Sequence, residues 1–394
     1  MLENDFFRVI LKIFILFNFM EFNQVIGQTF LAKYFQKTIQ TERVPNTQLF
    51  VGNEGSGTLP MAWAFARTLL CGENPKCQHK TDKIIHPDLH FVFPTVTGTG
   101  GQQVESDVFL SQWREFIIAN PYAGYYDWLQ FINAGNKQGS IRVKDAETII
   151  KKVAVKPYEA KYKVFIIWMA EKMNMETNNK LLKVLEEPPE DTKFILIAEK
   201  IENILPTVLS RCQIHHFKPV SITAIKENLL EKGIEEKTAL KIANSSEGNW
   251  NKAIQLLNNN PTEIEFQELF VTWVRSAFLA KTKKTAIQKL IQWSEEVAGK
   301  GREEQKHFLK FITESLRQAM LINFGNESLH YMEFQAGNFD LRKLAPYVNE
   351  TNIEEIFKLL NESLINIERN ANPKLIFINL SLSLTKLIHR KKII

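Results

Sequence analysis

The sequence predicts an α/β domain built on a parallel sheet, followed by two regions made only of helices. Strand-like and helix-period segments alternate from Met20 to Phe217, as an α/β domain requires. Segment 194–198 is apolar throughout, which is typical of a strand buried on both faces in the middle of a parallel sheet. After Phe217 the strand-like segments cease and only helical periodicity remains.

The first half of the α/β region reads helix, strand, helix, strand. Residues 30–41 have helical spacing, and residues 47–51 form a short apolar strand that enters a glycine-rich turn. Residues 61–70 have apolar residues on every face, which predicts a buried helix. A second strand covers 89–93, and we expect residues 95–140 to form a long connection rich in aromatic side chains.

The second half of the region continues the alternation and then gives way to helices. Its elements are a helix at 146–153, a strand at 163–168, a helix at 177–185 and a strand at 193–198. Pro188 and Pro189 cannot continue the third of these elements, so the helix ends before them. Three short helices follow at 221–232, 236–244 and 252–257, and residues beyond Pro261 have helical period only.

The composition is that of a globular protein with several domains. The chain has 394 residues, 44% hydrophobic and 24% charged, which excludes collagen-like and wholly disordered classes. A net charge of +5 permits a nucleic-acid partner without indicating one. Cys71, Cys77 and Cys212 are too few and too scattered for a disulfide framework, so we expect a reducing, cytoplasmic location.

An apolar run near the N-terminus has two interpretations. Residues 9–17 resemble a membrane anchor, but Lys12 interrupts them and they are far shorter than the ~20 residues that span a bilayer. Glu3 and Asp5 precede the run, whereas a secretory signal begins with basic residues. We therefore expect residues 1–19 to be a non-native extension, with Met20 as the initiator; a tethered adaptor is the alternative.

The turn after the first strand has the glycines of a phosphate-binding loop. Its sequence is Gly52-Asn-Glu-Gly55-Ser-Gly57-Thr58-Leu59, whereas a working loop needs G-x-x-x-x-G-K-[ST]. Thr58 stands where the lysine would contact the β- and γ-phosphates, and Leu59 where a hydroxyl would hold Mg²⁺. The glycines alone are equally compatible with an ordinary turn between a strand and a helix.

The later strand at 163–168 lacks the carboxylates that a nucleotide-hydrolysing site also needs. A P-loop ATPase ends this strand in carboxylates that support Mg²⁺ and polarise water. Here the strand ends in Trp168-Met169, and Glu171 is three residues further on. Two independent losses of the same chemistry in an otherwise intact scaffold predict an inactivated nucleotide site.

Several motifs occur in an order that resembles a known family. They are Phe22-Asn-Gln-Val-Ile-Gly27-Gln28, the altered phosphate loop, His86-Pro87-Asp88, Pro157-Tyr-Glu-Ala-Lys-Tyr-Lys163, Asn178-Asn-Lys-Leu-Leu-Lys-Val-Leu-Glu-Glu-Pro-Pro189 and Leu205-Pro-Thr-Val-Leu-Ser-Arg-Cys212. Together they resemble the bacterial clamp-loader AAA+ proteins. The resemblance is strong over residues 20–217 and weaker through the lid, and it returns at Asn370-Ala-Asn-Pro-Lys374.

The resemblance implies an architecture and a set of partners. It implies a RecA-like AAA+ domain of the P-loop type over 20–217, a small helical lid over 218–258 and an all-α collar for oligomerisation over 259–394. The partners would be the other clamp-loader subunits of DNA polymerase III, the sliding clamp and primer-template DNA. The missing nucleotide chemistry favours a non-hydrolysing stator with no productive ATP binding; the alternative is an atypical but active loader ATPase.

Further departures from the family pattern agree with that interpretation. Glu199-Lys200 replaces the polar residue that would sense the γ-phosphate, and Asn251 stands where a lid arginine is expected. Family members often carry a four-cysteine zinc site, but only Cys71, Cys77 and His79 are at hand. Three candidates fall short of the four ligands of a structural zinc, so we expect no metal.

Arg211 is the residue to which the resemblance gives a function. In clamp loaders this arginine enters the ATP site of the neighbouring subunit, where a guanidinium suits γ-phosphate oxygens because it stays charged and bonds them with a planar fork. Ser210 would set the loop that aims it. Taken alone, Arg211 is better interpreted as a surface arginine that closes a strand-loop junction, and it is the order of the motifs that favours the functional interpretation.

Two other groups of residues attract weaker functional hypotheses. Cys212 lies near His215 and His216, as a thiolate pair requires, but without an orienting carboxylate we expect a buried, inert cysteine. The basic segments 151–152, 161–163 and 389–392 are typical of solvated faces. Some of these lysines would contact DNA phosphates if the resemblance holds.

Overall fold

The computed structural model describes residues 20–98, 102, 104–258, 261–325, 332, 334 and 336–390. The expected N-terminal extension, residues 1–19, lies outside this part of the chain. The described residues group into two compact units. One contains residues up to 134 together with 139–258, and the other contains 135–138 together with the residues after 258.

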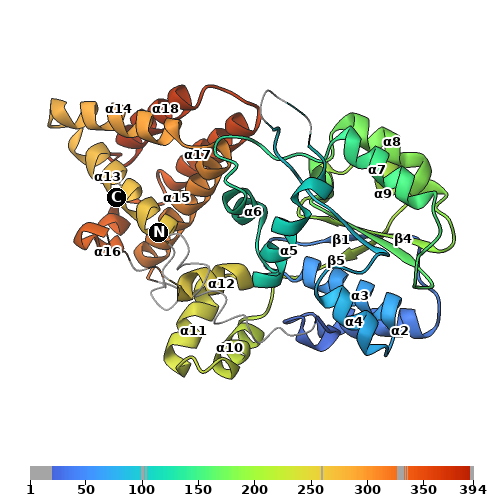
Figure 1. Ribbon diagram of the computed structural model, residues 1–394. Helices are drawn as coiled ribbons and strands as arrows, with labels where there is room; N and C mark the ends of the chain where they lie inside the picture. The colour runs from blue at the N-terminus through green and yellow to red at the C-terminus, as the bar shows by residue number, and fades with distance from the viewer. Residues whose placement is uncertain are drawn as a thin grey trace. The chain divides into compact units, whose positions relative to one another are not determined.

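A parallel sheet of five strands forms the centre of the first unit (Figure 1). The strands are β1 (Thr47–Val51), β2 (Leu89–Val92), β3 (Lys163–Trp168), β4 (Thr192–Ala198) and β5 (Gln213–His216). They are ordered β2-β3-β4-β1-β5, and each adjacent pair is parallel. The strand that opens the domain therefore lies inside the sheet, and the loop after it emerges at the carboxyl edge.

Helices cover both faces of this sheet (Figure 1). Alternate residues of each strand point to opposite faces, so Val164 and Ile166 belong to one apolar cluster and Phe165 and Ile167 to another. The first cluster includes side chains of α2 (Thr29–Gln40), α3 (Thr58–Cys71) and α5 (Leu110–Ala119). The second includes side chains of α7 (Val143–Val153), α8 (Met175–Glu186) and α9 (Pro206–Leu209).

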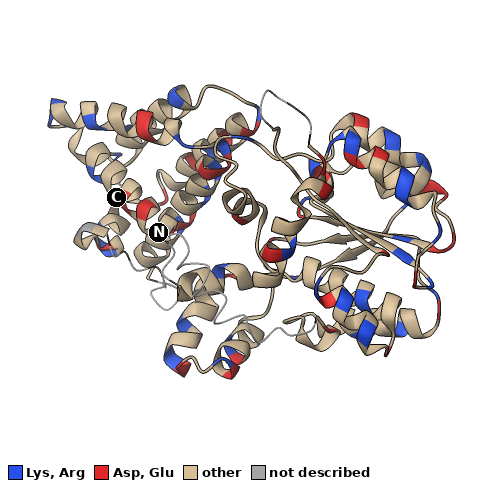
Figure 2. Cartoon of the chain, viewed as in Figure 1, with Lys and Arg blue, Asp and Glu red and all other residues tan. Residues whose placement is uncertain are grey.

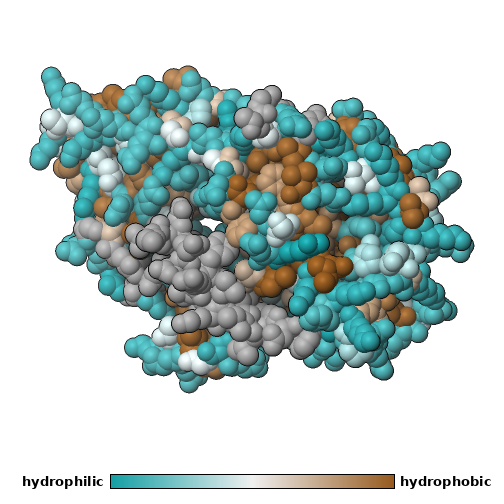
Figure 3. All heavy atoms as spheres, viewed as in Figure 1, coloured by the Kyte–Doolittle hydropathy of each residue, from teal (hydrophilic) through white to brown (hydrophobic). Residues whose placement is uncertain are grey.

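The outer surfaces of these helices are polar. Lys and Arg are prominent on α2, on α4 (Pro75–Asp82), on α7 and on α8 (Figure 2). The visible face over α7 and α8 is mostly hydrophilic (Figure 3). Many of the lysines make ion pairs, such as Lys180 with Glu147 and Lys152 with Asp107. The Lys/Arg excess thus lies on solvated helix faces.

The connection expected over 95–140 contains two helices, α5 and α6 (Tyr125–Phe131). Its aromatic residues form a core rather than a surface decoration: Trp113 stacks on Phe93 with centroids 4.2 Å apart and meets Trp128 edge-on at 5.2 Å. Both indoles are fully buried. This packing holds α5 and α6 against the sheet, although they interrupt the alternation of strands and helices.

Three short helices complete the first unit: α10 (Ile222–Glu231), α11 (Glu236–Ser245) and α12 (Trp250–Leu257). We call them the lid. Their apolar residues form a small cluster that also takes in Ile26 and Tyr122 from the α/β part. The Tyr122 hydroxyl accepts a hydrogen bond from the Ile26 backbone N–H at 2.9 Å.

The described part of the second unit is helical, as the sequence predicts. Its long helices are α13 (Pro261–Leu279), α14 (Lys284–Gly299), α15 (Arg302–Asn323), α17 (Ile353–Glu368) and α18 (Pro373–Leu387), with the short α16 at Leu341–Leu344. Trp273 and Trp293 stack at the centre of its core, 5.3 Å apart. Nowhere in the described chain is a helix both long and apolar enough to span a bilayer.

Candidate functional site: the phosphate loop and its surroundings

The turn between β1 and α3 keeps the backbone of a phosphate loop. Gly55 and Gly57 have φ values of +72° and +93°, which side-chain-bearing residues rarely adopt, so the turn requires glycine at both positions. Thr58 is the first residue of α3, three residues earlier than predicted. The Leu59 side chain is buried in the core below the loop, so the position that would hold Mg²⁺ contributes only packing.

Carbonyl groups of this loop are hydrogen-bonded to other parts of the first unit. The Gln28 side-chain amide donates to the carbonyl oxygens of Ser56 at 2.8 Å and Lys218 at 2.7 Å. The backbone N–H of Trp250, at the start of α12, donates to the Gly55 carbonyl at 3.2 Å. Gln28 therefore connects the loop to the segment before α10, and α12 connects it to the lid directly.

A pocket lies against the loop, between β3, β4 and the residues before α6. Its charged lining residues are Glu54 and Glu199, and none of the described residues that line it is lysine or arginine. Two carboxylates repel a triphosphate rather than bind it. The pocket is thus the reverse of the cationic cradle that a nucleotide requires.

The end of β3 shows what has replaced the missing acids. Trp168, the last residue of the strand, packs against Trp113 with ring centroids 5.0 Å apart and is almost completely buried. Glu171 does not line the pocket; its carboxylate accepts a hydrogen bond from the Glu199 backbone N–H at 3.0 Å. β3 therefore ends in a buried aromatic side chain, whereas the corresponding strand of a P-loop ATPase ends in a carboxylate.

Glu54 of the loop and Asp127 of α6 form an acidic pair beside the lid. The Asn251 side-chain amide donates to Glu54 at 2.8 Å and to Asp127 at 2.6 Å. Asp127 also accepts from the Gly124 backbone N–H and from the side-chain amide of Gln255. Burial, and then the nearby Glu54 carboxylate, raise the pKa of Asp127 to about 7, although the hydrogen bonds oppose the shift.

The raised pKa of Asp127 predicts a pH-dependent stability. Because the folded state binds the proton more tightly than the unfolded state, the contribution is present at low pH and is lost as the pH rises from 3.8 to about 7. Within that window the slope is at most ~1.4 kcal/mol per pH unit. Thermal unfolding at about pH 5 and about pH 8 measures it. The Asp127→Asn variant should lose this difference; an unchanged difference would contradict the assignment.

Arg211 lies directly after α9, where its guanidinium is held by its own chain. One terminal nitrogen, Nη2, is 2.9 Å from the Glu186 carboxylate at the end of α8. The other, Nη1, donates to the Thr207 carbonyl at 2.5 Å and to the Ser210 hydroxyl at 3.4 Å. The side chain is 26% exposed, so an external anion can reach it. The Ser210 hydroxyl therefore contacts the Arg211 guanidinium.

Cys212 is a free, half-buried cysteine directly after α9 and Arg211. The strand β5 begins at Gln213, and Cys212, directly before it, packs against the apolar cluster of α7 to α9. Burial raises the pKa of the Cys212 thiol to about 12, so the thiol stays protonated at neutral pH. His215 packs against Phe35 and Phe50 instead. The structure agrees with an inert cysteine.

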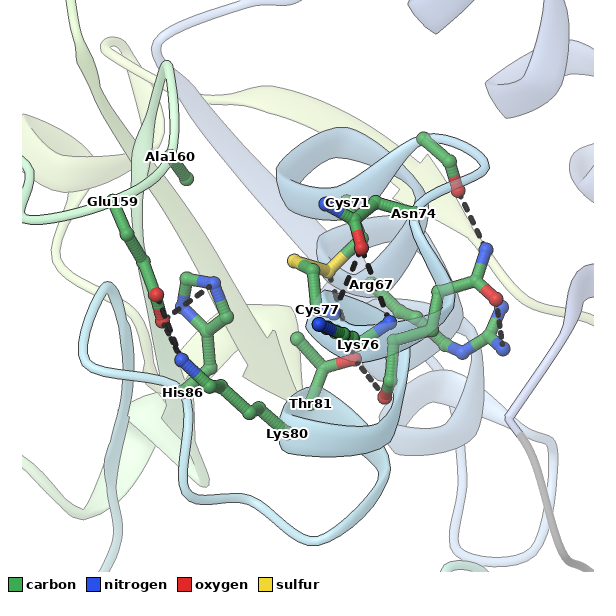
Figure 4. Close-up of a disulfide and its surroundings, with 12 residues drawn as sticks. Arg67, Cys71, Asn74, Lys76, Cys77, Lys80, Thr81, His86, Glu159 and Ala160 are labelled. Carbon is green, nitrogen blue, oxygen red and sulfur yellow. Dashed lines mark hydrogen bonds and ion pairs between the residues drawn. A yellow bond between two sulfur atoms is a disulfide. The ribbon is translucent and has the colours of Figure 1, made fainter.

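The other two cysteines correct the sequence-based prediction. Cys71 and Cys77 form a disulfide between the end of α3 and α4, with Cα atoms 5.3 Å apart (Figure 4). The sequence led us to expect no disulfide framework and a reducing location, but this pair is bonded because the turn at Gly72 folds α4 back onto α3. The third group near the sulfurs is His86, whereas His79 is exposed on α4.

The residues around the disulfide do not fit a structural zinc. Ligand atoms of Cys71, Cys77 and His86 lie within 4.8 Å of one another, but the two sulfurs are bonded to each other and are not thiolates. The His86 Nδ1 atom already accepts from the Asp88 backbone N–H at 3.1 Å. Three donors, two of them oxidised, fall short of a tetrahedral site.

Asp88 has a structural role that the sequence alone did not indicate. Its buried carboxylate accepts hydrogen bonds from the backbone N–H groups of Tyr158, Glu159 and Ala160 at 2.6, 2.9 and 3.0 Å. Burial raises the pKa of Asp88, but the three hydrogen bonds outweigh it and lower the pKa below 3.8. These hydrogen bonds therefore join two of the motifs quoted above, His86-Pro87-Asp88 and the segment that begins at Pro157.

The architecture defines the class of protein. A parallel sheet in the order β5-β1-β4-β3-β2, a glycine-rich loop from the inner β1 to α3 and a helical lid against that loop together make a RecA-like fold of the AAA+ type. The class does not by itself give a function.

Comparisons with known proteins identify the family. The model of the family described as "DNA polymerase III, delta subunit" matches residues 27–221. DNA polymerase III subunit delta' of Bacillus subtilis is 27% identical over 58% of this chain, and the subunit gamma of Buchnera aphidicola is 26% identical over 60%. Subunit tau of Bacillus subtilis is 23% identical over 90%. Over residues 27–221 the chain thus matches the clamp-loader family of bacterial DNA polymerase III.

The matches have a limited extent. The chain spans 56–60% of the length of these three relatives. Among solved structures, a gamma subunit-related protein of Thermotoga maritima is 15% identical with a TM-score of 0.32, covering 90% of this chain and 99% of that one. Thermotoga maritima RuvB is 15% identical with a TM-score of 0.39, covering 80% of this chain and 88% of that one.

Proposed function

We propose that the chain is a delta'-like, non-hydrolysing subunit of the replicative clamp loader. In this proposal it assembles with gamma/tau and delta subunits in the cytoplasm and helps place the sliding clamp on primer-template DNA. The observation that carries the proposal is the pocket at the phosphate loop, whose charged lining is Glu54 and Glu199. A site whose charged lining is two carboxylates lacks the cation that holds the phosphates of a bound triphosphate.

Arg211 is the group through which the subunit would act on its neighbour. A guanidinium on a loop at 26% side-chain exposure can bond γ-phosphate oxygens of a nucleotide bound to another chain. Positive charge at that position stabilises the transition state of phosphoryl transfer. The neighbouring subunit would supply its own lysine and Mg²⁺, so Arg211 adds charge and no other chemistry.

The isolated chain is expected to show no ATP turnover. Thr58, Leu59 and Trp168 replace the lysine, the hydroxyl and the acid that hydrolysis requires. The measurement is phosphate release by highly purified chain at saturating Mg²⁺ and ATP, with Thr58→Lys as the matched variant. ATP hydrolysis that co-purifies with the wild-type chain would favour the alternative, an atypical gamma/tau-like ATPase.

A further inference from the structure

Carboxylates and amides join the phosphate loop to the lid. We propose that Glu54 and Asp127, bonded to the amides of Asn249, Asn251 and Gln255, hold the lid on the phosphate loop in the absence of nucleotide. We call these five residues the lid tether. This inference rests on the proposed function, because it names what takes over the nucleotide's mechanical role in this subunit.

Asn251 is the central member of the lid tether. Its side-chain nitrogen donates to Glu54 on the loop and to Asp127 on α6, at 2.8 and 2.6 Å. Its side-chain oxygen accepts from the Asn120 amide at 2.7 Å. The residue is only 1% exposed, so this one lid amide has its hydrogen-bonding groups satisfied by three segments of the α/β part.

Two further lid amides extend the contact. Gln255, one turn along α12, donates to the second oxygen of Asp127 at 3.0 Å. Asn249 lies 3.5 Å from Glu54 through its amide nitrogen, while its oxygen caps the N-terminus of α12 by accepting from Lys252. Hydrogen bonds to carboxylates are stronger than those between neutral groups. The start of α12 is therefore bonded to acids of the loop and of α6.

The backbone packing leaves little room for any other arrangement. A β-carbon placed on Gly55 would overlap the side-chain amide of Asn249, and one on Gly124 would overlap the carboxylate of Glu54. The Trp250 backbone N–H also bonds the Gly55 carbonyl. The Trp250 indole is fully buried in the lid cluster, so α12 cannot shift without disturbing that core.

The lid tether has a consequence for the subunit's behaviour. In a nucleotide-dependent lid, the free energy that fixes the lid comes from the ligand, so the lid loosens when the ligand leaves. Here the side chains of the lid tether hold the lid, and they belong to the chain itself and cannot dissociate. The lid should therefore keep one orientation on the phosphate loop whether or not ATP is present, as a stator requires.

Hydrogen exchange measured by mass spectrometry on the full-length chain tests the lid tether. We expect peptides covering 52–57 and α12 to exchange at the same rate with and without Mg²⁺ and ATP. Glu54→Ala should speed their exchange about tenfold, the effect expected for losing one charge-assisted hydrogen bond in local opening. Glu54→Gln, which keeps one acceptor, should give a smaller increase.

A matched control and a folding check make the outcomes decisive. Glu227→Gln changes an exposed carboxylate on α10 of the same lid and should leave all rates unchanged. Peptides of β3 and β4 report global folding and should not respond to Glu54→Gln. Slower lid exchange on adding ATP to the wild type, or unchanged exchange in both Glu54 variants, would overturn the proposal. The readout involves no loader activity, and unchanged exchange in the Glu54 variants would overturn the lid tether while leaving the proposed function standing.

Discussion

Replacing Arg211 with alanine is expected to lower ATP turnover at the neighbouring site of a reconstituted loader by about 10³–10⁵, the usual value of an arginine supplied in trans. Turnover of the whole loader would fall only in part, because sites that do not face this subunit are unaffected. The physical reason is that the neighbour's γ-phosphoryl oxygens lose one external positive charge. The measurement is clamp- and DNA-stimulated ATP turnover at equal concentrations of assembled complex.

Two variants separate the chemistry of Arg211 from its local packing. Arg211→Lys keeps a charge but lacks the planar fork, so turnover should stay below that of the wild type. Glu186→Gln breaks the 2.9 Å ion pair and leaves the guanidinium in place, so it should retain turnover. Unchanged turnover in Arg211→Ala, with assembly verified by light scattering, would mean that Arg211 has only a structural role, in which it bonds the end of α8 to α9.

Asp88 offers the largest expected effect on stability. In Asp88→Asn, one amide oxygen replaces the two carboxylate oxygens that accept from the backbone N–H groups of residues 158–160. The new NH₂ group is a donor and cannot accept from them. Leaving buried donors without partners costs about 1–3 kcal/mol each, so the first unit should lose about 3 kcal/mol of unfolding free energy. That loss lowers its melting temperature by about 6–12 °C.

The neighbouring Glu159 provides the matched control for Asp88. Its carboxylate pairs with Lys80 at 2.7 Å on the surface, and surface pairs contribute about 0–1 kcal/mol. Glu159→Gln should therefore melt within a few degrees of the wild type. Because the pKa of Asp88 is lowered, its contribution is present above pH 3.8 and is lost as the pH falls below that value. Equal melting of Asp88→Asn and wild type would contradict the assignment.

The sequence predicted the fold well because its signals are local. The apolar run at 194–198 and the glycines of 52–57 each report on residues within one segment, and the structure places both where they were expected. Helix α3 starts at Thr58, three residues before the helix that the apolar pattern predicts. Proline is favoured in the first turn of a helix, so Pro60 fits this earlier start.

Features that join distant segments could not be predicted in this way. Asn251 meets Asp127 across 124 residues, and Asp88 meets Ala160 across 72. Nothing in the pattern around any of these residues indicates its partner. The disulfide was missed for a related reason: two cysteines six residues apart meet only because Gly72 reverses the chain between α3 and α4. Position along the chain also made His79 the candidate, although the fold brings His86 to the sulfurs.

Clamp loading onto primed DNA tests the central claim most directly. Gamma/tau and delta subunits from the same organism would be combined with clamp, primed DNA and ATP, with this chain either present or left out. The proposed function predicts efficient loading only when the chain is present. Loading that is equally efficient without it would contradict the claim that this chain is a working subunit of the clamp loader.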